Sequence, residues 1–212
     1  MQPARAGPRL TDVIARRLPV LLAAVATSAA LASGCSASVS AHPAAVTQPA
    51  TTGFSAMGLS FRYPAAWRHA SFGNDSSSFS GNIVDLSTSR LHDRCIGGPA
   101  QGALVCSGFP VDTLAPGGVL VMWTDWGFPN WHMPKPNATI GGRPAVETKT
   151  GAGSCATLGA AESITVMISR DVPDNWYQMD ACLRGPGLTQ LQAEIATMLS
   201  TVRIAKGDLH PR

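Results

Sequence analysis

The sequence is poor in charged and in aromatic residues. Charged residues make up 14% of its 212 residues and aromatic residues 6%, whereas 45% are apolar. So few charges exclude a coiled coil, and so large an apolar fraction excludes a disordered chain. The length allows one globular domain with appendages.

A surplus of positive charge is missing from most of the chain. The formal net charge is +3, but residues 1–34 hold four arginines and one aspartate, so the basic and acidic side chains of residues 35–212 balance. A nucleic-acid-binding domain needs an excess of Lys and Arg to neutralise phosphates. The balance excludes that class, and we expect no nucleic-acid partner.

Several catalytic and metal-binding motifs are also missing. The sequence contains no Gly-x-Ser-x-Gly, no His-Glu-x-x-His, no phosphate-binding loop and no Cys-x-x-Cys. These motifs carry the chemistry of lipase-type hydrolases, zinc proteases, nucleotide-binding enzymes and structural zinc sites. Gly151–Ala156 has the glycine spacing of a dinucleotide loop, but no clear strand precedes it, so we interpret it as a hairpin loop. We expect no catalytic residues, no cofactor and no metal.

Residues 1–34 have the pattern of an export signal. Four arginines precede the apolar run Pro19–Ala32, and the small residues Ser33 and Gly34 follow it. The run has about 14 residues and is shorter than the ~20 that span a bilayer. A short transmembrane anchor is the alternative. The Arg16-Arg17 pair leaves the twin-arginine route open, although general secretion is the simpler interpretation.

The end of this signal, Leu31-Ala32-Ser33-Gly34-Cys35, resembles the bacterial lipobox. Ala32 stands where leucine is commonest. The resemblance implies that Cys35 becomes the lipidated first residue, carrying fatty-acyl chains such as palmitate. One acyl chain gives marginal membrane binding, whereas two or three hold a protein stably. We therefore expect a cell-membrane protein that faces the extracytoplasmic side. The alternative is a soluble secreted protein with a stray cysteine.

Composition divides the rest of the chain. Residues 35–53 should comprise the lipidated cysteine and a flexible tether, because this segment has no aromatic residue and, apart from His42, no side chain that can carry charge. We expect residues 54–205 to form the globular domain and residues 206–212 a short tail.

Four cysteines remain once Cys35 is assigned to lipid, namely Cys95, Cys106, Cys155 and Cys182. An even number in an exported chain indicates two disulfides. Three pairings are possible, and we favour Cys95–Cys106 and Cys155–Cys182. The first pair would close a tight loop. Each bond would contribute on the order of 3 kcal/mol.

Hydrophobic periodicity predicts an α+β fold. Strands are expected at 59–63, 83–88, 118–123, 138–140, 144–148, 164–169 and 176–183. In the segment 118–123 both the odd-numbered and the even-numbered positions are apolar, so this strand should lie in the middle of the sheet with both faces covered. Gly141-Gly142 marks a hairpin. One helix is expected over 188–202, with Thr189 and Gln192 as a capping box, and a last short strand at 202–204. The result is an antiparallel sheet with a C-terminal helix.

Two segments resemble PsbP-like domains, which include many actinobacterial lipoproteins. Gly58–Trp67 is similar to their opening G-x-x-F-x-x-P-x-x-W, and Ile140–Ala145 is similar to their central Gly-Gly-Arg-Pro-Ala hairpin. The resemblance implies an α/β/α sandwich and a domain that binds or scaffolds. The candidate disulfides and the insertion between Cys95 and Cys106 depart from the family.

The aromatic residues after 125 suggest a binding segment. Trp126, Phe128 and Trp131 lie near glycine, proline and asparagine, so we expect a loop, and loops often carry binding residues. With Met133 they form a candidate lip that contacts a ligand or partner. The alternative is that these rings fold back and cap the sheet.

The sequence thus predicts a membrane-anchored extracytoplasmic lipoprotein that acts as a binding or scaffolding module for a protein or an envelope lipid. One alternative is an extracytoplasmic hydrolase that uses His92 and Asp93. A structural or antigenic surface protein is another.

Overall fold

A computed structural model of the protein describes residues 49–72, 80–97, 104–106, 108–128, 130–171 and 174–207. The chain divides into the units Met1–Ala45 and Val46–Arg212, and every described residue belongs to the second. The expected export signal, Cys35 and most of the expected tether lie outside the described residues.

The described elements follow one another as strands with one helix near the end. In chain order they are β1 (Thr51–Ala56), β2 (Leu59–Pro64), β3 (Arg68–Ala70), β4 (Ser80–Ser87), β5 (Cys95–Gly97), β6 (Leu104–Cys106), β7 (Val119–Gly127), β8 (Ala138–Ile140), β9 (Arg143–Gly151), the 3-10 helix η2 (Gly153–Leu158), β10 (Glu162–Ser169), β11 (Asn175–Leu183), α1 (Leu188–Ser200) and β12 (Arg203–Ile204). The predicted α+β class with a C-terminal helix is confirmed.

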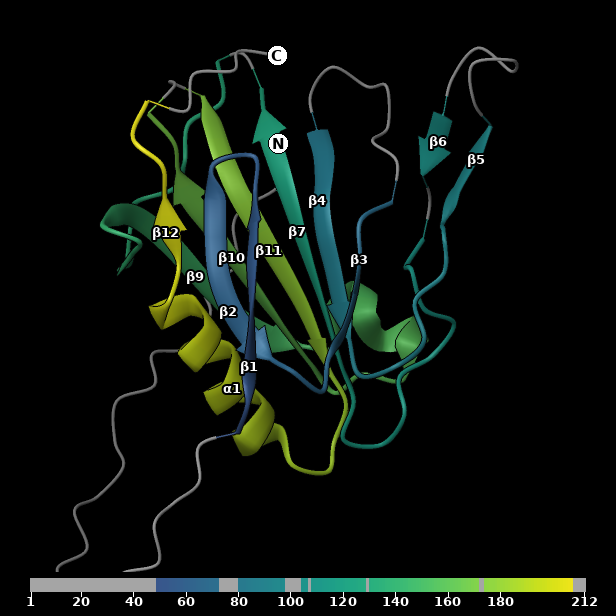
Figure 1. The fold of residues 1–212 in the computed structure, drawn as a ribbon. Helices are drawn as coiled ribbons and strands as arrows, with labels where there is room; N and C mark the ends of the chain where they lie inside the picture. Colours follow the sequence, from purple (N-terminus) through teal and green to yellow (C-terminus); the bar gives the residue numbers. More distant parts are fainter. Residues whose placement is uncertain are drawn as a thin grey trace, which may run out of the picture. The chain divides into compact units, whose positions relative to one another are not determined.

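The main sheet is antiparallel and has the strand order β3-β4-β7-β11-β10-β9-β8 (Figure 1). Strand β7 lies between β4 and β11, away from both edges. The side chains of Val119 to Trp123 are buried on both faces of the sheet, which confirms the prediction of a central strand. An apolar run without alternation is typical of such a strand, because neither side meets water.

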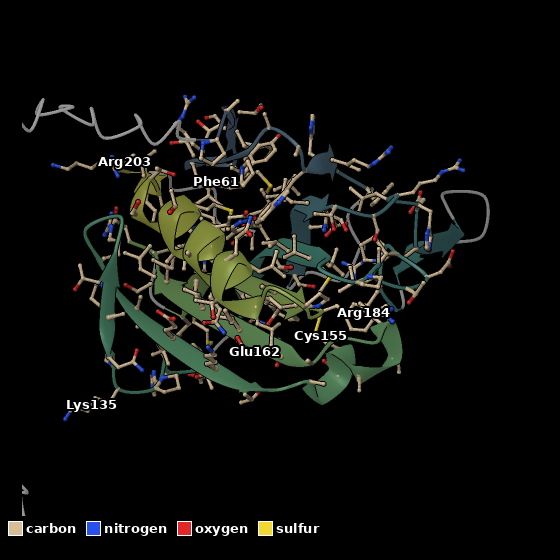
Figure 2. The ribbon with its side chains drawn as sticks, turned by 90° about the horizontal axis from the view of Figure 1, so that it is seen from below. Phe61, Lys135, Cys155, Glu162, Arg184 and Arg203 are labelled. Carbon is tan, nitrogen blue, oxygen red and sulfur yellow. A yellow bond between two sulfur atoms is a disulfide. The ribbon has the colours of Figure 1, made fainter. Side chains whose placement is uncertain are left out.

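One face of the main sheet, here called the first face, packs against α1 and the small sheet β1-β2-β12. Val121 and Trp123 of β7 belong to this core, and Trp123 stacks on Phe61 of β2 with 5.3 Å between ring centroids. Figures 1 and 2 show α1 lying against this face of the sheet.

Helix α1 buries the apolar stripe that its periodicity predicts, through Leu191, Ile195, Met198 and Leu199. The predicted capping box is wrong. The helix begins at Leu188, its N-cap is Gly187, and no side chain caps it. Gln192 instead donates hydrogen bonds from Nε2 to both carboxylate oxygens of Glu162 on β10, at 2.9 and 3.0 Å. These two hydrogen bonds therefore connect the helix to the sheet.

The predicted Gly141-Gly142 hairpin is confirmed, and it joins β8 to β9. Both glycines have positive φ, 59° and 78°. A two-residue turn of this kind matches the right-handed twist of the strands but needs left-handed backbone, which glycine adopts without steric cost.

The opposite face of the main sheet, here called the second face, has no α-helix over it among the described residues. A smaller core covers one end, where Leu114 and Leu158 pack on Leu120, Met122 and Cys182. Leu158 belongs to η2. The implied α/β/α sandwich therefore has one helical layer in the described chain, and a 3-10 helix with a loop lies on the other side.

Several predicted boundaries differ from the structure. Strand β1 begins at Thr51, inside the expected tether, because it pairs with β2 along its whole length. The expected loop between Cys95 and Cys106 contains the strands β5 and β6. The expected hairpin loop at Gly151–Ala156 holds the last residue of β9 and the start of η2. Trp126 lies within β7 and not in a loop.

Candidate functional site

Aromatic rings gather on the second face where β7 ends and β11 begins. Trp126 and Trp176 are directly paired in the antiparallel register. Their ring centroids are 6.1 Å apart and their planes differ by 6°. Because directly paired residues of neighbouring strands point to the same face, this contact follows from the register.

Two further rings extend this pair into a row. Phe128 stacks on Trp126 with 6.2 Å between centroids, and Trp131 stacks on Trp176 at 3.9 Å. We call Trp126, Phe128, Trp131 and Trp176 the aromatic cluster. Trp176 is buried, Trp126 and Trp131 are half-buried, and Phe128 is 41% exposed. The cluster covers the end of the sheet and still presents ring surface to solvent.

The sequence identified three of these rings but not Trp176. Trp176 belongs to the strand predicted at 176–183, and nothing in the sequence around it indicates that this strand pairs with β7. The predicted lip also included Met133, which is half-buried and lies beside Trp131 in the lining of a small cavity.

Asp174, in the turn between β10 and β11, holds the segment that carries Phe128 and Trp131. Its backbone carbonyl accepts a hydrogen bond from the N–H of Phe128 at 3.1 Å, and its Oδ2 accepts one from the N–H of Asn130 at 3.2 Å. Asn130 and Asp174 both have positive φ, 63° and 62°. Asn and Asp tolerate this conformation better than other residues with side chains.

A cavity of about 190 Å³ lies beside the aromatic cluster. Its lining comprises Trp131, His132, Met133, Ser169, Arg170, Asp174, Asn175 and Trp176. His132 Nδ1 lies 3.6 Å from Asp174 Oδ1. The guanidinium of Arg170 is already paired, with Nη1 2.6 Å from Asp125 Oδ1, and it lies over the ring of Tyr177.

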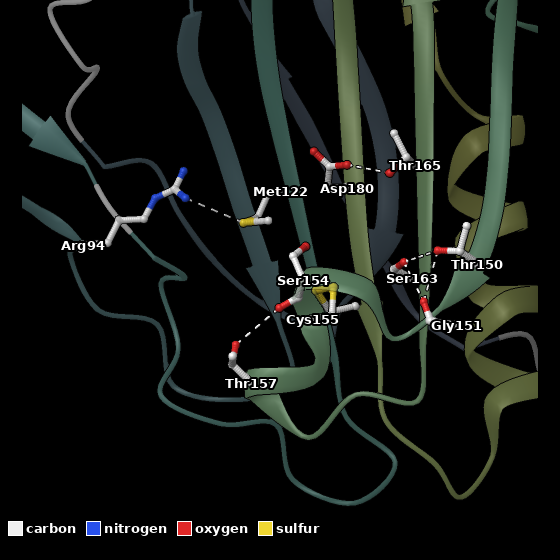
Figure 3. Close-up of a disulfide and its surroundings, with 11 residues drawn as sticks. Arg94, Met122, Thr150, Gly151, Ser154, Cys155, Thr157, Ser163, Thr165 and Asp180 are labelled. Carbon is white, nitrogen blue, oxygen red and sulfur yellow. Dashed lines mark hydrogen bonds between the residues drawn. A yellow bond between two sulfur atoms is a disulfide. The ribbon is translucent and has the colours of Figure 1, made fainter. Parts of the chain in front are cut away.

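A row of hydrogen bonds continues from the cluster along the second face. Trp176 Nε1–H donates to Gln178 Oε1 at 3.3 Å, and Gln178 Nε2 donates to Asp180 Oδ2 at 2.7 Å. Thr165 donates its hydroxyl to Asp180 Oδ1 at 2.8 Å (Figure 3). These side chains are half-buried or buried. The part of the second face next to the aromatic cluster is therefore polar, and hydrogen bonds connect its side chains to one another.

Asp85 of β4 is a buried carboxylate on the same face, with no exposed surface. Burial raises its pKa to about 6, although the positive charge of Arg94 and the hydrogen bond from Asn82 lower it in part. Asn82 Nδ2 donates to Asp85 Oδ1 at 3.0 Å. Within the described chain, Asp85 Oδ2 and Asn82 Oδ1 have no hydrogen-bond partner. Two buried acceptors therefore lack a donor.

Arg94 lies beside this carboxylate and connects the segment before β5 with the sheet. Its Nη1 donates to the carbonyl of Gly108 at 2.9 Å and lies 3.9 Å from the sulfur of Met122, as Figure 3 shows for the methionine. Arg94 thus connects the segment before the β5–β6 hairpin with the segment after it.

The structure contains the disulfide Cys155–Cys182, with 5.6 Å between Cα atoms (Figure 3). It joins η2 to β11. Cys95 and Cys106 are directly paired in the register of β5 and β6, a backbone arrangement compatible with the second predicted bond, which stays a prediction. Cys35 lies outside the described residues.

The residues of the alternative hydrolase lie on the surface before β5. His92 Nε2 is 3.9 Å from Asp112 Oδ1. Asp93 is exposed and has an interaction partner of its own. Throughout the described part of the chain, no group of three or more His, Cys, Asp or Glu residues is placed to hold a metal ion.

A larger cavity of about 450 Å³ lies where the described chain begins, between the start of α1 and the turn after β2. Its lining is Pro49, Ala50, Pro64, Ala65, Ala66, Trp67, Thr88, Gly117, Pro186, Gly187, Gln190, Leu191 and Glu194. Most of these side chains are small or apolar, and among these described residues only Glu194 carries a charge.

Comparisons with known proteins found no matching family model, no matching curated protein and no matching solved structure. A search of the described helices for a membrane span also found none of sufficient length and hydrophobicity.

Proposed function

We propose that the protein is a lipid-anchored binding module on the extracytoplasmic side of a membrane, and that the aromatic cluster contacts its protein or envelope-lipid partner. The observation that carries most of this proposal is the cluster itself. Four rings gather at one end of a sheet, and Phe128 leaves 41% of its surface exposed. Aromatic residues are enriched at the centres of protein interfaces and dominate their binding energy.

Two features support the anchor and the compartment. The lipobox-like segment Leu31–Cys35 directly follows an apolar run of signal-peptide length. Disulfides such as Cys155–Cys182 form and persist mainly outside the reducing cytoplasm. We assign the diacylglyceryl thioether to Cys35 and the standoff from the membrane to the residues that follow it.

A PsbP-like domain is part of the same proposal. The motif Gly58–Trp67 covers β2 and the turn that follows it, and Gly141-Gly142 joins β8 to β9. The order β11, α1, β12 at the end of the domain also fits the resemblance. In this family such domains bind or scaffold, which agrees with a contact surface and not with a catalytic centre.

The larger cavity supports the envelope-lipid form of the proposal. Its volume of about 450 Å³ falls within the range of roughly 300–1,000 Å³ that small-molecule sites occupy. The exposed ring of Phe128 supports the protein form, because a protein partner needs an accessible patch rather than a deep pocket.

Photo-crosslinking in the native host tests the proposal. A photoreactive phenylalanine analogue replaces Phe128 in the full chain, and the same analogue replaces Met57 as a control. Met57 is also 41% exposed but lies in the turn between β1 and β2. We expect a discrete protein or lipid adduct from position 128 and none from position 57.

A second variant ties the adduct to the cluster. Trp126→Ala removes the ring on which residue 128 stacks, and we expect at least a tenfold weaker adduct, since such anchors contribute ~2 kcal/mol or more. Equal labelling from positions 57 and 128, or no adduct from position 128, would contradict the proposal. Mass spectrometry of the adduct distinguishes a lipid from a protein.

A further inference from the structure

We infer that the cavity of about 190 Å³ beside Trp131 binds a neutral sugar ring, either in a free glycan or in the headgroup of a glycolipid. The inference rests on the proposed function, because it names a ligand class for the same end of the domain.

The cavity offers an aromatic wall with a defined orientation. Trp131 stacks on Trp176 at 3.9 Å between centroids, and both rings belong to the lining. Asp174 fixes the backbone that carries Trp131 through the N–H groups of Phe128 and Asn130. A rigid, half-buried indole is a suitable partner for the C–H face of a sugar, since aromatic rings combine large contact area with a preferred geometry.

Polar side chains around this wall have hydrogen-bonding capacity to spare. Within the described residues, the hydroxyl of Ser169 and the amide of Asn175 have no hydrogen-bond partner that would occupy them, and His132 Nδ1 lies 3.6 Å from Asp174 Oδ1. Hydroxyl and amide groups both donate and accept. Sugar hydroxyls have the same dual character, so they match this set.

The charged residues of the lining are already engaged with the protein. Arg170 pairs with Asp125, and the two carboxylate oxygens of Asp174 face His132 and the N–H of Asn130. Among the described residues, each charged side chain of the lining already has a partner within the protein, which favours a neutral ligand over a phosphate or an amine.

The volume agrees with a single ring. Because one water occupies about 30 Å³ in the liquid, a cavity of about 190 Å³ has room for about six waters. That space suits one hexose, with the rest of a glycan extending into solvent, and it is too small for an acyl chain.

Titration of the full chain in detergent tests the inference. The probes are methyl glucoside, methyl galactoside and methyl mannoside, followed by tryptophan fluorescence and saturation-transfer NMR. Glucuronate and choline serve as charged counter-probes. Vesicles of phosphatidylcholine with and without a glucosyl-diacylglycerol then distinguish a headgroup from a free sugar. We expect saturable millimolar binding of at least one neutral glycoside and no comparable binding of either counter-probe.

Single substitutions locate the binding. Ser169→Ala and Asn175→Ala should each weaken it about two- to tenfold, the effect of one lost hydrogen bond. Trp131→Ala should abolish it. Gly127→Ala is a further test, because its Cβ would lie 2.4 Å from Asn175 Oδ1 and would displace that amide. Met57→Ala is the control, since Met57 lies in the turn between β1 and β2 and is outside the lining, and it should leave sugar affinity unchanged.

Each outcome decides the inference. No saturable binding of any neutral glycoside overturns it, and so does binding that survives Trp131→Ala, Ser169→Ala and Asn175→Ala together. Equal binding of glucuronate or choline overturns the neutral ligand class. If sugars fail to bind while crosslinks from position 128 persist, the sugar site is wrong and the proposed function stands.

Discussion

Replacing Asp85 with asparagine is expected to stabilise the domain at pH 7 by roughly 2–3 kcal/mol. Burial raises the pKa of this carboxyl from 3.8 to about 6, and one pKa unit corresponds to about 1.4 kcal/mol. At pH 7 the folded protein therefore holds a charge that burial disfavours. Asparagine keeps the shape, removes the charge and puts a donor in place of Asp85 Oδ2, one of two buried acceptors that lack a donor among the described residues.

The same group gives the wild-type protein a distinctive pH dependence. Between about pH 4 and pH 6 the folded state binds this proton more tightly than the unfolded state, so the Asp85 contribution to stability is full below pH 4 and declines as the pH rises through 6. Urea unfolding at pH 5 and pH 7 measures this slope, which Asp85→Asn should remove.

Asp180→Asn is the matched control for this experiment. Asp180 lies on the same face but accepts hydrogen bonds from Thr165 and Gln178. Weakening these bonds should cost about 1 kcal/mol. A loss of stability at pH 7 in Asp85→Asn, or an unchanged pH slope, would contradict the assigned state of the buried carboxylate.

Loss of the Cys155–Cys182 disulfide is expected to destabilise the domain by about 3–4 kcal/mol. The two cysteines are 27 residues apart, and closing a loop of that size removes this much unfolded-state entropy in the chain-entropy model. Both side chains are buried in the smaller core, which joins η2 to β11. For a domain of this size the change corresponds to a fall in Tm of about 10 °C.

Calorimetry of the double variant Cys155→Ala/Cys182→Ala measures the effect. The control is a Cys95→Ala/Cys106→Ala background, which lacks the second predicted bond. A reductant should lower the Tm of this background by a similar amount, and adding Cys155→Ala/Cys182→Ala should remove that sensitivity. A double variant that melts within about 2 °C of the wild type would show that the bond does not constrain the unfolded chain as assumed.

The parts of the fold that sequence predicted are those with a strong local signal. Residues 118–123 indicated a central strand because they are apolar on both parities, and Gly141-Gly142 indicated a hairpin because only such residues adopt the turn readily. The helix over 188–200 followed from its three- and four-residue apolar spacing. Each of these signals depends on neighbouring residues alone.

The parts that sequence missed depend on partners far away in the chain. Trp176 joins the aromatic cluster because β11 pairs with β7, about 50 residues earlier, in one particular register. Asp85 is fully buried on the second face, where β4 pairs with β7, although the sequence of its own strand gives no sign of a buried charge. The expected capping box does not form because α1 begins at Leu188, before Thr189, and Gln192 contacts Glu162 on another element instead.

Mass spectrometry of the protein extracted from the membranes of its native host tests the lipid anchor most directly. We expect the mature chain to begin at Cys35 and to exceed the polypeptide mass by a diacylglyceryl group, with a further N-acyl chain in the usual case. Cys35→Ala should yield protein without this added mass and outside the membrane fraction. A mature wild-type chain that begins at another residue, or that carries no fatty-acyl mass, would contradict a membrane-anchored binding module.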